Sequence, residues 1–369
     1  MLQKLTNFLT KLISNDKLKN SLVNSVIFKK MHYKQIVPQI LDKIKKAAYP
    51  LIISHENPDG DTLGASLALA NFLAKGKIDH QHFCIDKPAA YFSFLPQIEK
   101  LTTNYNHINL NRHDLILAID CGSLARTGIA ADLLKIKDKT PLINIDHHQS
   151  NDLYGHYNLV LPQASSTSEI VYNFFYHNKI GIDKYMATNL LTGILSDTMN
   201  FTNALTTDDS LKIASDLLKF GARVNQITSN LTQNKDLNSL KLWGKILSRL
   251  SFVPEDNFAY TYISQNDFIE NQIEPDKIDG LANFLTALQD VDFILVLTEE
   301  ADGTIKGNLR TTKDNIDVSK LARALNGGGH QKAAGFKIKN QTFLSAAALP
   351  ETIINDIINQ IKMLKQNNL

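Results

Sequence analysis

The stretch of sequence that decides the fold is residues 142–150, LINIDHHQS, an apolar run that ends abruptly in polar side chains. Such a run is typical of a strand buried on both faces of a parallel sheet. Three adjacent polar side chains directly after a buried strand must find partners or a metal ion. Because ligands bind at the carboxyl ends of strands in open α/β sheets, we expect Asp146, His147 and His148 to mark a functional site.

A similar arrangement occurs after the first apolar run of the chain. Residues 51–53, LII, precede the loop SHENPDGD, whose proline and glycine disfavour a helix. Such a loop can aim the side chains of His55, Asp59 and Asp61 into one cavity. The alternative is an ordinary turn in which the two carboxylates accept hydrogen bonds from the backbone.

Two further aspartates follow apolar runs. Asp120 comes directly after residues 115–119, LILAI, and Asp197 follows residues 193–195, GIL, after one serine. Each aspartate taken singly could cap a helix. Four such strand-end positions in one α/β domain make independent caps improbable, so the sequence predicts one shared site.

The candidate ligands of that site are two imidazoles and four carboxylates: His55, Asp59, Asp61, Asp120, His147 and Asp197. Oxygen-rich sets with some imidazole suit manganese or magnesium, whereas cysteine would be expected at a structural zinc site. Six side chains are too many for one catalytic metal that keeps open positions. They fit two metals about 3.5–4 Å apart with a bridging carboxylate, an arrangement that stabilises the attacking and leaving oxygens in phosphoryl hydrolysis.

Length and composition place these motifs in a globular protein of two domains. The chain has 369 residues, which exceeds the roughly 250–300 that a single core supports. Its 43% hydrophobic and 21% charged residues exclude a disordered or collagenous chain. The apolar stretches are far shorter than the roughly 20 residues that span a bilayer, and two cysteines fit a reducing compartment. We therefore expect a cytoplasmic protein without integral membrane association.

The charge is unevenly distributed along the chain. Residues 1–47 hold ten lysines and two aspartates, whereas the whole chain carries only +2, so the remainder is acidic. An acidic body argues against binding of long duplex nucleic acid, which needs a basic surface. Residues 1–47 are predicted to form a basic helical extension. Packing of this extension on its own body or a partner subunit is favoured over contact with a membrane or nucleic acid.

The ordered set of motifs resembles the DHH phosphoesterase family, which takes its name from a motif like Asp146-His147-His148. In the second half, residues 308–310 (NLR), 317–322 (DVSKLA) and 327–336 (GGGHQKAAGF) are similar to the DHH-associated C-terminal domain. Within the family, the chain most resembles the nanoRNase branch. Its two-domain length and the runs 164–169 (ASSTSE) and 196–201 (SDTMNF) carry that resemblance.

The alternation of short apolar runs with helical patterns already predicts an α/β fold. The resemblance implies an N-terminal domain with a mostly parallel, doubly wound sheet of the DHH type, a smaller C-terminal α/β domain, and an active site in the cleft between them. The expected boundaries are an extension over 1–47, a metal-binding catalytic domain over 48–205, a helical connector over 206–245 and a substrate-binding domain over 246–369.

The resemblance also implies which residues hold each metal ion. One divalent ion is expected on His55, Asp59 and Asp120. The second is expected on Asp61, Asp120, His147 and Asp197. Asp120 would then bridge the two ions, for which manganese is preferred over magnesium or cobalt.

Two catalytic roles follow from the same resemblance. Asp146 is expected to orient a histidine, the usual task of a carboxylate beside a ligating imidazole. His148 is expected to contact the scissile phosphate and to assist the leaving oxygen.

A phosphate-binding group is expected in the C-terminal domain. Arg310 can contact a phosphate through two donors, and His330 can add another. Gly327, Gly328 and Gly329 can let backbone amides approach phosphate without interference from a Cβ. A tight turn is the alternative for the glycines.

The predicted activity is manganese-dependent hydrolysis of short oligoribonucleotides to mononucleotides, and of 3′-phosphoadenosine 5′-phosphate (pAp) to AMP. The partners would be short single-stranded RNA, dinucleotides and pAp. The enzymatic alternative is a phosphodiesterase for cyclic or linear dinucleotides of the c-di-AMP or pGpG type. A nucleotide-binding regulator without catalysis is disfavoured because the ligand set is complete. The sequence leaves open whether the chain forms a homodimer.

Overall fold

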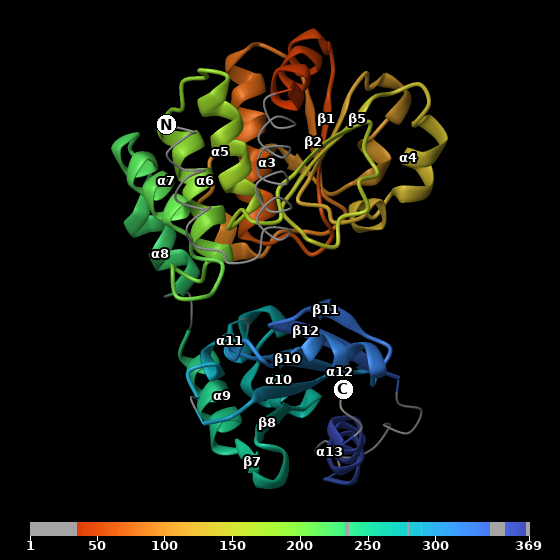
Figure 1. Ribbon diagram of the computed structural model, residues 1–369, viewed down its shortest axis with the longest axis vertical. Coiled ribbons are helices and arrows are strands. Elements are labelled where there is room, and N and C mark those ends of the chain that lie inside the picture. Colours follow the sequence, from red (N-terminus) through yellow and green to blue (C-terminus); the bar gives the residue numbers. More distant parts are fainter. Residues whose placement is uncertain (1–34, 233–235, 279, 289, 340–350, 367–369) are drawn as a thin grey trace, which may run out of the picture. The chain divides into compact units, whose positions relative to one another are not determined.

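The computed structural model describes residues 35–232, 236–278, 280–288, 290–339 and 351–366. The chain divides into two compact units, one ending at Gln233 and the other beginning at Asn234. Each unit contains a sheet and helices (Figure 1). Most of the predicted basic extension, residues 1–34, lies outside the described residues.

The first unit is built on a six-stranded parallel sheet with the order β3-β2-β1-β4-β5-β6. Its strands are β1 (Leu51–Ser54), β2 (Gln81–Phe83), β3 (Leu101–Thr102), β4 (Ile116–Ile119), β5 (Leu142–Asp146) and β6 (Tyr157–Val160). The predicted doubly wound sheet is therefore confirmed. The strand order reverses between β1 and β4, and ligands bind at the carboxyl ends of the strands at such a point.

The helices of this unit lie on both sides of the sheet (Figure 1), although the last two pack on the helix that precedes them. They are α3 (Gly60–Lys75), α4 (Ala130–Ile136), α5 (Thr167–His177), α6 (Lys184–Asp197), α7 (Asp208–Lys219) and α8 (Val224–Thr232). One expectation was wrong, because Asp197 is the last residue of α6 and does not follow a strand. Residues 186, 190, 191, 194 and 195 are apolar and buried at helical spacing, which explains the helix.

Two glycines bring α3 and α6 into close contact. A Cβ on Gly64 of α3 would lie 2.4 Å from the carbonyl oxygen of Asn189 in α6. A Cβ on Gly193 would lie 2.7 Å from the Asp61 Oδ1 atom. Because both distances are shorter than van der Waals contact, only glycine lets the two helices approach this closely. The end of α6, with Asp197, is thereby held next to the start of α3.

A helix before β1 belongs to the first unit as well. Residues 35–46 are helical, and the side chains of Val37, Ile40 and Ile44 are buried in the same core as Ile52 of β1. The end of the predicted extension therefore packs on the body of the protein.

The second unit has a mixed sheet with the order β11-β12-β10-β9-β8-β7, in which only the β8–β9 pair is parallel. The strands are β7 (Ser251–Val253), β8 (Phe258–Ile263), β9 (Phe293–Glu299), β10 (Ile305–Arg310), β11 (Gly328–His330) and β12 (Ala333–Ile338). The helices are α9 (Leu237–Ser248), α10 (Gln265–Asn271), α11 (Leu281–Leu285), α12 (Val318–Ala324) and α13 (Glu351–Gln366). The expected smaller α/β domain is thus present.

The helices that were expected to form a separate connector, residues 206–245, are divided between the two units. Ile213, Leu217 and Ile227 of α7 and α8 are buried in the core of the first unit. Leu242 of α9 is buried in the core of the second. Each helix buries apolar side chains in the core of one unit, so the sequence pattern predicts the helices but not the unit to which each belongs. None of the helices in the described residues combines the length and apolarity needed to span a bilayer.

Candidate metal centre

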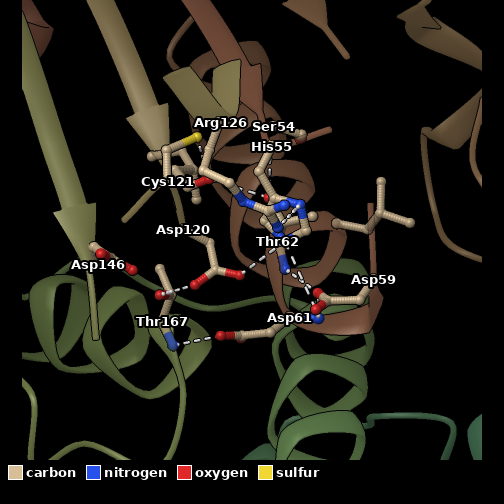
Figure 2. Close-up of polar contacts among 12 residues, drawn as sticks. Ser54, His55, Asp59, Asp61, Thr62, Asp120, Cys121, Arg126, Asp146 and Thr167 are labelled. Atoms are coloured by element: carbon tan, nitrogen blue, oxygen red, sulfur yellow. Dashed lines mark hydrogen bonds and ion pairs between the residues drawn. The ribbon is translucent and has the colours of Figure 1, made fainter. Parts of the chain in front are cut away.

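The site forms where β1 and β4 end, at the point at which the strand order reverses. His55 directly follows β1, and Asp120 directly follows β4. Asp120 adopts a left-handed backbone conformation with a φ of 60°, which is uncommon for residues other than glycine. Figure 2 shows the side chains of His55, Asp59, Asp61 and Asp120 turned toward one another.

The first group of ligand atoms surrounds the Nε2 atom of His55. This atom lies 3.4 Å from Asp120 Oδ2 and 3.6 Å from Asp59 Oδ2. The Nδ1 atom of the same ring lies 2.6 Å from the carbonyl oxygen of Glu56. A proton on Nδ1 would be held by that carbonyl, which leaves the lone pair of Nε2 for a metal ion.

Asp59 serves two purposes with its two oxygens. Its Oδ1 atom caps helix α3 by accepting hydrogen bonds from the backbone nitrogens of Asp61 and Thr62, at 3.0 and 3.1 Å. Its Oδ2 atom faces His55. From the sequence, this loop was either an ordinary turn held by backbone hydrogen bonds to its carboxylates or part of a site. Asp59 can do both, because one oxygen accepts the backbone bonds and the other faces His55.

The second group of ligand atoms surrounds the Nε2 atom of His147. This atom lies 3.2 Å from Asp197 Oδ2, 3.8 Å from Asp120 Oδ1 and 4.0 Å from Asp61 Oδ2. The two oxygens of Asp120 thus face different groups, Oδ2 toward His55 and Oδ1 toward His147. Asp197 joins the site from the end of a helix rather than from a strand.

The crowded carboxylates perturb the pKa values of the site. Burial, followed by the charges of Asp197 and Asp120, raises the pKa of Asp61 well above its ordinary value. Burial raises the pKa of Asp197 to about 6, against the opposing effect of His147. Burial also disfavours the imidazolium of His147, but the neighbouring carboxylates outweigh it and raise its pKa. Bound cations would take the place of these protons and relieve the repulsion.

The donor set fits divalent metal ions. Two sets of three residues place ligand atoms within 4.8 Å of one another, namely His55 with Asp59 and Asp120, and Asp61 with His147 and Asp197. A third set combines Asp120 with His147 and His148. Carboxylates with imidazole suit manganese or magnesium. The structure therefore brings together all six residues named from the sequence. Asp120 belongs to the set with His55 and Asp59 but not to the set of Asp61, His147 and Asp197, although its Oδ1 atom lies 3.8 Å from His147 Nε2.

A hydrogen-bonded carboxylate lies behind His148. The Nδ1 atom of His148 lies 2.7 Å from Asp146 Oδ1, and the side chain of Asn151 donates to Asp146 Oδ2. Although burial favours the neutral acid, the hydrogen bonds from His148 and Asn151 lower the pKa of Asp146 to about 2. Asp146 is thus an ionised acceptor against the imidazole of His148. Asn151 lies in the following loop, and no motif pointed to it.

Sequence reasoning also missed the contribution of helix α5. Thr167 and Ser168, its first residues, donate backbone hydrogen bonds to the carboxylate of Asp61. The signal was the pattern Ser166-Thr167-Ser168-Glu169, which is typical of a helix start. That pattern predicts the helix but does not identify Asp61 as the acceptor for its first backbone amides. Asp61 lies more than 100 residues earlier in the chain.

In the second unit, Arg310 and His330 lie in one row across the sheet. Both are paired in register with Ala333 of β12, Arg310 from β10 and His330 from β11. Directly opposite residues of antiparallel strands have side chains on the same face. Arg310 Nε donates to Asn283 Oδ1 at 2.9 Å, and among the described residues Arg310 forms no ion pair with a carboxylate.

The glycine run has a packing explanation at two of its three positions. A Cβ on Gly327 would lie 2.1 Å from the carbonyl oxygen of Gly335, and one on Gly329 would lie 2.5 Å from the Cα atom of Ala334. Gly328 has open space around it. Close strand packing therefore accounts for Gly327 and Gly329, and neither the expected phosphate loop nor the alternative, a tight turn, is needed to explain them.

Comparison with known proteins identifies the two domains of the chain. Residues 51–194 match the DHH family, N-terminal domain, and residues 255–362 match the DHHA1 domain. The chain is 27% identical to the bifunctional oligoribonuclease and PAP phosphatase NrnA of Thermus thermophilus, over 83% of this chain and 88% of that protein. It is 26% identical to the protein of the same name from Bacillus subtilis, over 79% and 90% of the two chains.

A solved structure shares the fold. An exopolyphosphatase-related protein from Bacteroides fragilis has a TM-score of 0.79 and 23% sequence identity, and the match covers 90% of this chain and 98% of that one. The first domain match includes the six strands of the first sheet, and the second includes β8 to β12 of the second sheet. The chain therefore belongs to the DHH family, with a DHH domain followed by a DHHA1 domain.

Proposed function

We propose that this protein is a two-metal phosphoesterase that hydrolyses short oligoribonucleotides to mononucleotides and pAp to AMP. The observation that carries the proposal is the pair of ligand groups that share Asp120. The relatives named oligoribonuclease and PAP phosphatase support the choice of substrates. Two buried, unpaired cysteines suit a reducing compartment, so we place the enzyme in the cytoplasm.

We assign one ion to the group around His55 and the other to the group around His147, with Asp120 bridging. Manganese is the ion we favour, because the donors are carboxylates and imidazoles without cysteine. Bound divalent ions would lower the pKa of a bound water and neutralise charge that develops on the phosphate.

His148 is suited to give a proton to the leaving oxygen. Burial disfavours its charged form, but Asp146 and Asp120 outweigh this and raise the pKa of His148. Its Nδ1 atom is held by Asp146, so Nε2 is the atom that can face a substrate. As the bond from phosphorus to the leaving oxygen breaks and the bond from phosphorus to the water oxygen forms, His148 would transfer its proton to the leaving oxygen.

We propose that Arg310 binds a phosphate of the substrate, with His330 beside it. Burial lowers the pKa of Arg310. In the part of the chain that the structure describes, no carboxylate pairs with its guanidinium, and an anionic ligand would supply that partner. Arg310→Ala is expected to raise KM for pAp with a smaller effect on kcat. Arg323→Ala, which removes an exposed arginine of α12, is the matched control.

The proposed function is tested with a panel of substrates and manganese. A diadenylate, longer RNA oligomers, pAp, pGpG and a cyclic dinucleotide are each incubated with the purified full-length chain. We expect rapid turnover of the short RNAs and of pAp, and loss of at least a thousandfold in Asp120→Asn, because an amide is a poor bridging ligand. Turnover of the cyclic dinucleotide alone, or unchanged turnover by Asp120→Asn, would contradict the proposal.

A further inference from the structure

Helix α5 begins against the metal centre and supplies no ligand to it. The first amides of a helix have no acceptor within the helix. Here the backbone nitrogens of Thr167 and Ser168 donate to the two oxygens of Asp61, at 2.6 and 2.8 Å. Ser166 caps the helix by accepting from the backbone nitrogen of Glu169 at 3.0 Å. The start of α5 thus fixes the position of the Asp61 carboxylate.

The side chain of Thr167 contacts a second carboxylate. Its hydroxyl donates to Asp120 Oδ1 at 2.7 Å, and Figure 2 shows Thr167 joined by dashed lines to both Asp120 and Asp61. This is the oxygen that faces His147, whereas Oδ2 faces His55. Thr167 is fully buried, so a water molecule cannot readily replace its hydroxyl.

The hydrogen bond constrains the orientation of the Asp120 carboxylate, whose oxygens face both groups. A carboxylate oxygen has two lone pairs, so Oδ1 can accept from Thr167 and still face a metal ion. The nearby carboxylates of Asp61 and Asp197 repel Asp120 and would turn it away from the His147 group. The hydroxyl of Thr167 opposes that rotation.

We propose that Thr167 is a positioning residue that holds Asp120 in its bridging orientation and thereby sets the affinity of the ion at the His147 group. The proposal rests on the proposed metal centre and deepens it. It predicts that loss of the hydroxyl weakens one of the two ions and leaves the ion at the His55 group largely unaffected.

The decisive variant is Thr167→Val, which replaces the hydroxyl by a methyl group and keeps the backbone bonds to Asp61. Manganese binding is followed by calorimetry and by the electron paramagnetic resonance signal of free Mn²⁺, without substrate. We expect the affinity of one of two sites to fall about 10- to 100-fold, which is usual when a partner of a metal ligand is lost. Thr167→Ser keeps the hydroxyl and should bind both ions within about threefold of the parent.

Thr192→Val is the matched control. Thr192 is also fully buried in the first unit, but its hydroxyl donates to the carbonyl oxygen of Thr188. This variant should retain both affinities. Thr167→Ala removes the same hydroxyl with a smaller side chain, and far-UV circular dichroism establishes that each variant is folded.

Two results would overturn the proposal. One is parent-like affinity at both sites in folded Thr167→Val or Thr167→Ala. The other is a Thr167→Ser variant that binds as weakly as Thr167→Val. The titration needs no substrate, so the two proposals are tested separately. A parent chain that binds two ions but cleaves neither RNA nor pAp would refute the proposed function and leave the role of Thr167 intact. Activity that Thr167→Val regains at high manganese concentration would further support a positioning role.

Discussion

Replacement of Gly193, in helix α6, by alanine should lower the affinity for a metal ion at the His147 group. The added Cβ would lie 1.9 Å from the Oγ atom of Ser168 and 2.7 Å from Asp61 Oδ1, whereas ordinary contact begins near 3.4 Å. Asp61 would have to retreat by about 0.7 Å, but metal–ligand distances tolerate only about 0.2 Å. We therefore expect manganese affinity at the His147 group to fall at least about tenfold.

The effect of the same substitution on folding is smaller and is confined to the first unit. Overpacking costs about 1–3 kcal/mol, whereas alanine in place of glycine in a helix gains about 1 kcal/mol. The net loss should be about 1 kcal/mol. Trp243 is the sole tryptophan and lies in the second unit, so its fluorescence transition should not move, while the far-UV circular dichroism transition of the first unit should shift to lower denaturant.

Gly244→Ala is the matched control for this experiment. Gly244 lies in helix α9, and a Cβ there would meet no atom within 4 Å. Its replacement should raise the stability of the second unit by about 0.5–1 kcal/mol, seen by Trp243 fluorescence, and leave manganese binding unchanged. If Gly193→Ala bound both ions as the parent does, the proposed role of the α3–α6 contact would be refuted.

Three further predictions concern folding stability. Ile40→Ala should destabilise the first unit by about 2–5 kcal/mol, because Ile40 is fully buried; an unchanged circular dichroism transition would show that residues 35–46 do not contribute to this core. Burial, with the charge of His80, lowers the pKa of His82 to about 3. As the pH falls, His82 therefore takes up a proton in the unfolded chain before it does so in the folded protein. The free energy of unfolding of the first unit should fall by up to about 1.4 kcal/mol per pH unit below about pH 6.5. The His82→Gln variant should show a shallower slope. Although burial favours the neutral acid, hydrogen bonds from Arg249 and Ser264 hold the pKa of Asp267 well below its ordinary value. Ionised Asp267 should thus stabilise the second unit above about pH 3.9, and this contribution should be lost in stronger acid. In the Asp267→Asn variant, Trp243 fluorescence should show no such loss.

The strand-end part of the site was predictable from the sequence because local patterns encode it. Buried parallel strands appear as short apolar runs, and their carboxyl ends meet at one edge of the sheet. His55, Asp120 and His147 follow such runs, so their proximity follows from the topology alone.

The remaining features depend on contacts that the local pattern does not record. Asp197 was expected after a strand because its apolar run is short, but the run continues a helical pattern that starts at Met186. The division of α7, α8 and α9 between two cores depends on which core each apolar face enters. The bonds from α5 to Asp61 and Asp120 join residues far apart in sequence, and a capping pattern cannot name such partners.

The left-handed backbone of Asp120 restricts which inactive variants are useful for trapping a bound substrate. Alanine at this position would remove the carboxylate and also add backbone strain of about 1 kcal/mol, so a lost activity could reflect a displaced loop. Asparagine adopts the left-handed region far more readily. A complex prepared with Asp120→Asn should therefore preserve the conformation of the loop after β4. The substrate position seen in it would then not be altered by a displaced loop.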